Sequence, residues 1–173
     1  MKRFTLLDFL TPDNNLEKET VGQIIANCKK EMISKNDFLL KEGETCRHSF
    51  FVESGLLRQY SIDEKGKEHI IQFAPENWII SDRESVYFKN SSIYFIQAIE
   101  KTNVYFIDEE FILNLSKTNP EFLEFNNQLL HNHIRQLQKR INGLLSESAE
   151  ERYLEFIKIY PDIQLRVPQT MIA

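Results

Sequence analysis

Leu56–Phe73 reads LLRQYSIDEKGKEHIIQF, and this stretch decides the fold. Two runs of β-branched, aromatic and apolar residues flank the turn sequence Asp63-Glu64-Lys65-Gly66. Glycine near the end of such a turn supplies the positive φ that tight hairpin connections require. The stretch therefore predicts two antiparallel strands, 56–62 and 67–73, joined as a hairpin.

Further short apolar runs lie on both sides of this hairpin, between residues 32 and 107. Turn sequences separate them, as Lys41-Glu42-Gly43-Glu44 and Glu53-Ser54-Gly55 do. The expected strands are Phe38–Leu40, Phe50–Val52, Ile93–Ile99 and Val104–Ile107. Many short strands at this spacing are typical of an antiparallel sandwich or barrel. We expect an α+β protein built on an antiparallel β jelly-roll barrel.

Helical signals lie outside the barrel region. An amphipathic pattern covers residues 16–28, before the strands. Asp108-Glu109-Glu110, Asn119-Pro120-Glu121 and the capping box Ser148-Ala149-Glu150-Glu151 each predict a helix start after them. The last helical signal, Val167-Pro168-Gln169, lies at the end of the sequence.

The long helix expected after Asn119 carries an apolar seam. Its members are spaced alternately by four and three residues: Leu123, Asn127, Leu130, Ile134, Leu137, Ile141 and Leu144. This is the a/d pattern of a coiled coil, and it predicts a homodimer. A second stripe, with Phe122, Phe125, Leu129 and His133, lies beside it. The alternative is one helix that covers the barrel of a monomer.

Composition excludes several classes of protein. The 173 residues are 42% hydrophobic and 27% charged, which is typical of a globular chain, and the net charge of −5 argues against a generally DNA-binding surface. Cys28 and Cys46 have neither zinc nor disulfide spacing. The apolar N-terminal run is broken by Asp8 and Pro12, and no stretch is long enough to span a membrane. We expect a cytoplasmic protein.

Catalytic and metal-binding patterns are missing from the sequence. His131 and His133 are two residues apart in the expected long helix, so their side chains would point in different directions. No nucleophile elbow, P-loop, dinucleotide fingerprint or HExxH motif occurs. Acids such as Glu42 and Glu64 lie at expected turns, where solvated surface accounts for them. We therefore predict no catalytic residues, no metal ligands and no enzyme activity.

One connection between strands has the composition of a binding segment. In Phe73–Ser85, an apolar entry with Trp78 is followed by Ser81, Asp82 and Arg83. These residues could form a turn whose amides and hydroxyls face an anion. The alternative is an ordinary short helix with Trp78 in the core.

The order of these motifs resembles the cyclic nucleotide-binding domain of Crp/Fnr transcription regulators, in the form common among Bacteroidetes. The resemblance rests on Gly55-Leu56-Leu57-Arg58, Asp63-x-x-Gly66-Lys67-Glu68, the helix after Asn119-Pro120, and the Ser148–Tyr153 and Arg166–Gln169 segments. It implies an effector-sensing barrel at 1–118, a dimerisation helix at 119–145, and the start of a winged helix-turn-helix at 146–173. The remainder of that DNA-binding domain would follow Ala173, so DNA is an implied partner through residues absent here.

The resemblance also implies an effector site. Ser81-Asp82 stands near the pair that binds the ribose in cyclic-AMP-binding members, and Ser91-Ser92 stands near their phosphate-binding pair. Leu137 and Gln138 occupy the helix positions that contact the purine. Together with Trp78 and Arg83, these are the candidate ligand-binding residues, for a small anionic effector.

Two features of the sequence restrict which ligand that site could bind. The arginine that neutralises the phosphate is missing at Ser91-Ser92, and a buried phosphate without a cation is costly, so the sequence argues against cyclic AMP as a cofactor. Cys28 and Cys46 do not form the N-terminal cysteine cluster of the iron–sulfur branch. The alternative function is a stand-alone small-ligand-binding module with no role on DNA.

Overall fold

The predicted hairpin forms one side of a four-stranded sheet. In the computed structural model, which describes residues 5–11 and 16–172, β4 (Leu57–Ile62) pairs antiparallel with β5 (Glu68–Ala74). The register places Leu57 opposite Ala74 and Ile62 opposite Glu68. Gly66 closes the turn at φ +79°, as the hairpin sequence requires.

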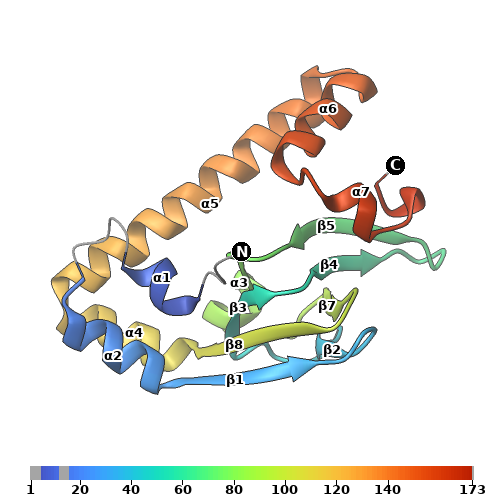
Figure 1. Ribbon diagram of the computed structural model, residues 1–173. Coiled ribbons are helices and arrows are strands. Elements are labelled where there is room, and N and C mark those ends of the chain that lie inside the picture. Colours follow the sequence, from blue (N-terminus) through green and yellow to red (C-terminus); the bar gives the residue numbers. More distant parts are fainter. Residues whose placement is uncertain (1–4, 12–15, 173) are drawn as a thin grey trace. The chain divides into compact units, whose positions relative to one another are not determined.

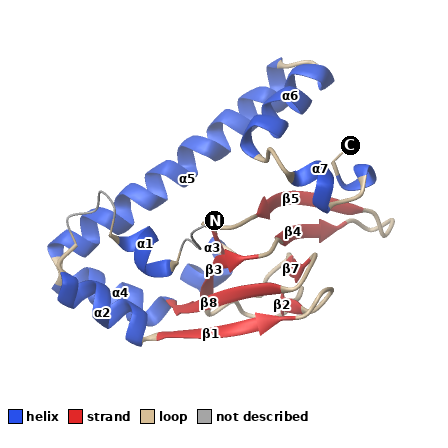
Figure 2. Cartoon of the chain, viewed as in Figure 1, coloured by secondary structure: helices blue, strands red, loops and turns tan. Residues whose placement is uncertain are grey.

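Two antiparallel sheets make up the barrel (Figure 1; Figure 2). The first has the order β1-β8-β3-β6, and the second has the order β2-β7-β4-β5. The remaining strands are β1 (Cys28–Ile33), β2 (Phe38–Leu40), β3 (His48–Ser54), β6 (Ile79–Ile80), β7 (Phe95–Ala98) and β8 (Thr102–Asp108). Apart from the β4–β5 hairpin, neighbours in each sheet are not consecutive in sequence, as in a jelly roll, so the predicted fold class is confirmed.

The core lies between the two sheets. Strand alternation directs every second side chain inward, and both sheets contribute fully buried residues. The core cluster comprises Leu40, Cys46, Phe50, Val52, Leu57, Ala74, Ile80, Val86, Ile96, Ala98 and Val104. Val86 belongs to α3 (Arg83–Phe88), so the connection between β6 and β7 is packed into the core.

Gly55 makes the sharp connection between β3 and β4 possible. Its φ is +101°, and a Cβ placed there would lie 2.5 Å from the Oγ1 atom of Thr102 and 2.6 Å from its Cα. The turn is held by two hydrogen bonds, from Gly55 N–H to Glu76 and from Leu56 N–H to Thr102 Oγ1. Only glycine satisfies both the backbone conformation and the close approach to β8.

Most predicted helix starts are confirmed. Asp108 caps α4 (Glu109–Thr118), Asn119 accepts a hydrogen bond from Phe122 N–H at the start of α5 (Pro120–Ser146), and Ser148 forms a capping box at α6 (Ala149–Ile159). The remaining helices are α1 (Leu6–Leu10), α2 (Lys18–Ala26), α7 (Ile163–Arg166) and the short 3₁₀ helix Gln169–Met171.

The helix predicted at 16–28 is too long at both ends. Helix α2 ends at Ala26, and Cys28 is the first residue of β1, where it pairs with Ile107. The strand predicted at Ile93–Ile99 begins only at Phe95. The pairing of Cys28 with Ile107 limits the end of α2, and the pairing of Phe95 with Tyr60 marks the start of β7. Local periodicity in the sequence does not report such pairing with a distant strand.

The chain divides into two compact units, Met1–Phe122 and Leu123–Ala173. The first contains the barrel with α1 to α4, and the second contains most of α5 with α6 and α7. Within the second unit, Lys139 of α5 forms an ion pair with Glu155 of α6. Among the described residues, no helix is both long and apolar enough to cross a membrane.

Candidate functional site

The segment between β6 and β7 begins with a capped helix. The Asp82 carboxylate, buried to 4% exposure, accepts hydrogen bonds from the N–H groups of Glu84 (3.1 Å) and Ser85 (3.2 Å). The structure therefore shows the alternative of an ordinary short helix. The amides that could have faced an external anion are bonded to a carboxylate of the chain itself.

Arg83 points away from this cap toward the start of α4. Its Nη1 donates to Oε1 of Glu109 at 3.0 Å, and Ser49 Oγ of β3 donates to the same oxygen. The Glu109 side chain is 4% exposed, whereas that of Arg83 is 37% exposed. Arg83 therefore neutralises an internal carboxylate.

Two further contacts anchor the segment to the barrel. Ser85 Oγ accepts from Cys46 N–H at 2.8 Å and donates to the carbonyl of Asn90 at 2.6 Å. Trp78 is half-buried and packs against the core cluster. These contacts hold the segment against the barrel and satisfy the buried hydroxyl of Ser85.

The two serines near the expected phosphate position differ in their surroundings. Ser91 is exposed, whereas Ser92 is buried and exchanges backbone hydrogen bonds with the turn after β2, through Gly43 and Glu44. The Ser92 hydroxyl accepts from Tyr94 N–H at 3.0 Å. Within residues 79–93, all of which the structure describes, the cations are Arg83 and Lys89. Lys89 is exposed, and Arg83 is paired with Glu109.

Leu137 and Gln138 lie in the second unit, on exposed positions of α5. The predicted seam runs along the same helix: Leu123, Ile134, Leu137, Ile141 and Leu144 are between 42% and 61% exposed. Asn127 is also exposed, and Leu130 is half-buried. This is a large apolar surface for one helix to present to water.

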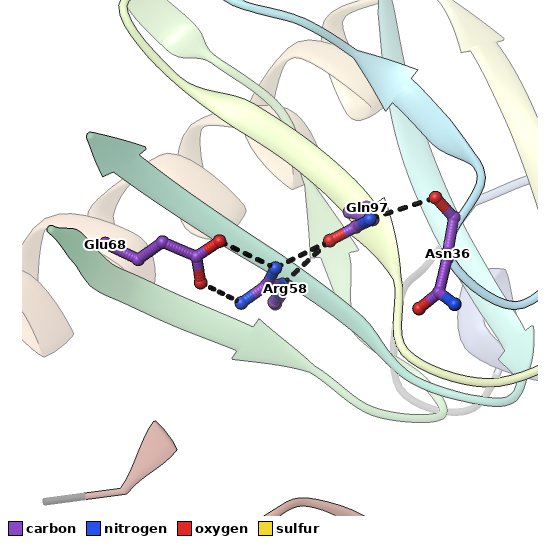
Figure 3. Close-up of polar contacts among 4 residues, drawn as sticks. All are labelled: Asn36, Arg58, Glu68 and Gln97. Carbon is purple, nitrogen blue, oxygen red and sulfur yellow. Dashed lines mark hydrogen bonds and ion pairs between the residues drawn. The ribbon is translucent and has the colours of Figure 1, made fainter. Parts of the chain in front are cut away.

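A polar cluster that the sequence did not reveal lies on the second sheet (Figure 3). Arg58 of β4, 7% exposed, donates two bonds to the Glu68 carboxylate of β5 and two to Oε1 of Gln97 on β7. Gln97 in turn donates to the carbonyl of Asn36 at 2.9 Å. The Arg58 guanidinium also lies 4.1 Å from the ring centre of Tyr60. Burial raises the pKa of Tyr60, although the Arg58 charge opposes this shift.

The Arg58 cluster and Glu109 had no local sequence signal. Arg58 and Glu109 each pair with a residue on another element, 10 and 26 positions away. The Glu68 carboxylate, 42% exposed, is half of a bidentate ion pair with Arg58.

The described residues hold no group of three or more His, Cys, Asp or Glu side chains suited to a metal ion. The two cysteines are separate free thiols, Cys28 in β1 and Cys46 in the core. Burial raises the pKa of Cys28 to about 11 and also raises that of Cys46. Both thiols are therefore protonated at neutral pH.

Comparison with known proteins gives the family. The sequence profile of the cyclic nucleotide-binding domain matches residues 30–119, slightly more than half of the chain and all of β2 to α4. The chain belongs to the cyclic nucleotide-binding domain family. Within it, the chain is similar to the fumarate and nitrate reduction regulatory protein of Vibrio cholerae, with 30% identity over 144 residues, 83% of this chain and 56% of the relative.

One further curated protein is similar to this chain in sequence, and one solved structure is similar in fold. Electron transport regulator A of Shewanella oneidensis is 30% identical over 129 residues, 75% of this chain and 51% of the relative. A crystal structure of a putative Crp/Fnr-family transcriptional regulator from Eubacterium rectale shares the fold, with a TM-score of 0.69 and 19% identity over 91% of this chain and 73% of the other. The chain spans about half the length of the curated relatives it matches.

Proposed function

We propose that this chain is the effector-sensing and dimerisation portion of a Crp/Fnr-type transcription regulator. The observation that carries the proposal is the exposed 4-3 seam of α5, directly after a barrel of the cyclic nucleotide-binding family. A coiled-coil seam left in water is unfavourable, and a second copy of the same helix offers a matching surface. The occupant proposed for this face is therefore a second copy, in parallel orientation.

The proposed activity of the dimer is control of DNA binding. A helix-turn-helix domain, mostly outside the 173 residues, would be positioned by α5, and the segment from Ser148 would be its start. An effector in the barrel would shift the population of dimer arrangements and so set the separation of two recognition helices. The protein acts in the cytoplasm and catalyses no reaction.

The candidate effector-binding residues of the first unit are Trp78, Ser81, Asp82, Arg83, Ser91 and Ser92, and those of the second unit are Leu137 and Gln138. The internal pairing of Arg83 with Glu109, and of the Glu84 and Ser85 amides with Asp82, supports an effector other than cyclic AMP. Lys89 is the cation of this segment that an anionic effector could use without breaking an internal pair.

A binding experiment with DNA tests the proposal. The full-length protein and residues 1–173 would each be incubated with a library of genomic fragments from the source bacterium, with gel shift of the enriched fragments. The full-length protein should select a two-fold-symmetric site, whereas residues 1–173, with their net charge of −5, should bind none of them specifically. Failure of the full-length protein to select any fragment would favour a stand-alone ligand-binding module.

A further inference from the structure

Arg83, Glu109 and Ser49 form a partly buried contact between three elements, which we call the latch. Arg83 is the first residue of α3, Glu109 is the first residue of α4, and Ser49 lies on β3. Arg83 Nη1 and Ser49 Oγ both donate to Oε1 of Glu109. The latch therefore connects the segment between β6 and β7 to α4, the helix that precedes α5.

The position of α4 depends on Arg83 because Glu109 is buried. The N–H of Glu109 also donates to the carbonyl of Arg47 at 3.3 Å, so the residue is fixed at both backbone and side chain. An acid in the first turn of a helix is favourable, but a carboxylate that is 4% exposed still requires a cation to offset its lost hydration. Without Arg83, the remaining side-chain donor would be the Ser49 hydroxyl, and α4 would move toward solvent.

A continuous chain of contacts leads from α4 to α5. Asn119 closes α4 through its N–H to the carbonyl of Leu115 and begins α5 through Oδ1, which accepts from Phe122 N–H at 2.9 Å. The Asn119 Nδ2 group donates to Thr20 Oγ1 of α2, also at 2.9 Å. A displacement at the start of α4 is therefore passed to the start of α5 with no intervening loop.

We propose that the latch is a conformational coupling device: the Arg83–Glu109 contact transmits the state of the β6–β7 segment to α5 and sets the strength of its dimer. The inference rests on the proposed dimerisation through α5. Asp82 and Arg83 are consecutive, so any ligand that shifts the α3 cap also shifts the guanidinium that holds Glu109. Arg83 and Glu109 are positioning residues for the dimer helix.

The chain offers a matched control pair in Arg58 and Glu68. This pair also joins a buried charged side chain to a partly exposed partner, although here the arginine is the buried member, at 9% exposure, and the carboxylate is 42% exposed. The pair lies within the β4–β5 hairpin. Arg58 also contacts Gln97 of β7 and Tyr60 of β4, so within the part of the chain that the structure describes these contacts stay inside the second sheet. Loss of either pair should lower stability, but only loss of the latch should alter the dimer.

The test measures the dimer dissociation constant by sedimentation and amide exchange in α4 by mass spectrometry. Arg83→Met, Glu109→Gln and the double variant should each raise the dissociation constant at least about five-fold, with the double variant close to each single one, because one interaction is removed. Arg58→Met and Glu68→Gln should leave it within about two-fold. If Arg83→Met does not fold, Arg83→Lys keeps the charge with a shorter reach and should shift the constant in the same direction.

Two results would overturn the latch. One is an unchanged dissociation constant in the Arg83 and Glu109 variants, and the other is an equal change in the Arg58 variant. A monomeric wild type would contradict the proposed dimerisation instead, and amide exchange then tests the contact itself. Exchange in α4 should rise in Arg83→Met and not in Arg58→Met, and equal exchange in both would refute the link between α3 and α4.

Discussion

Replacement of Gly55 by alanine should destabilise the barrel more than any other single added methyl group at a glycine of this chain. Gly55 has φ +101°, a conformation that costs a residue with a Cβ roughly 1–2 kcal/mol. The new Cβ would also lie 2.6 Å from the Thr102 backbone, and such overpacking costs roughly 1–3 kcal/mol. The expected loss for Gly55→Ala is therefore about 2–5 kcal/mol.

Substitutions at two other glycines separate the cost of the backbone conformation from the cost of the close contact. Gly66 has φ +79° with no atom within 4 Å of the added Cβ, so Gly66→Ala should cost only the backbone contribution of about 1–2 kcal/mol. Gly22 lies in α2 with open space around it, so Gly22→Ala should stabilise the chain by about 0.5–1 kcal/mol.

Urea unfolding measures all three variants through the fluorescence of Trp78, the one tryptophan of the chain, which packs against the core cluster. The midpoints should rank Gly22→Ala, wild type, Gly66→Ala and Gly55→Ala from highest to lowest, at similar slopes. A Gly55→Ala midpoint equal to that of Gly66→Ala would refute the argument that close contact with Thr102 adds to the backbone strain.

Three more predictions follow from single contacts. Calorimetric titration with cyclic AMP should give no binding at micromolar concentration, because Arg83 is paired with Glu109; a micromolar or tighter dissociation constant would prove this wrong. Alkylation of Cys28 by iodoacetamide should be slow at pH 8 and accelerate toward pH 11, and fast labelling at pH 8 would contradict the burial of this thiol. Because folding raises the pKa of Cys28 from 9.0 to about 11, the contribution of this thiol to stability is present below pH 9 and is lost as the pH rises through 11. Ser148→Ala should destabilise α6 by about 1 kcal/mol, seen as faster amide exchange in α6 but not in the barrel, and unchanged exchange would show that the capping box contributes little.

The turns and helix caps could be predicted from the sequence because each depends on residues close together in the chain. The Asp63–Gly66 turn, the caps at Asp108 and Asn119, and the Ser148 capping box are each formed by residues within four positions of one another. Their geometry is set by hydrogen bonds within one turn, so the sequence alone identifies them.

Elements that depend on distant partners escaped prediction. β1 contains Lys29, Lys30 and Glu31 and has little apolar periodicity, because it is a sheet edge that pairs only with β8 among the described strands. Helix α1 is five residues long, although Thr5 and Asp8 form a capping box that could have revealed it. Its apolar run is too short to show helical periodicity.

The candidate effector site stays a prediction, but the structure shows how its side chains are paired. In the segment from Trp78 to Ser92, the Asp82 carboxylate is bonded to backbone amides and Arg83 is paired with Glu109. The pairing of Arg83 with Glu109 joins residues 26 positions apart and could not follow from spacing. The separation of the α5 residues Leu137 and Gln138 into the second unit is likewise a property of the fold, not of the helix pattern.

The mass of residues 1–173 in solution tests the central claim most directly. Light scattering at micromolar concentration should give twice the 20.5 kDa of one chain, because the α5 seam buries several leucine and isoleucine side chains, each worth roughly 1.5–3 kcal/mol. The double variant Ile134→Asp and Leu137→Asp should give a folded monomer, since both side chains are exposed within one chain. A wild-type mass of 20.5 kDa, or a dimer that survives both substitutions, would contradict dimerisation through the seam.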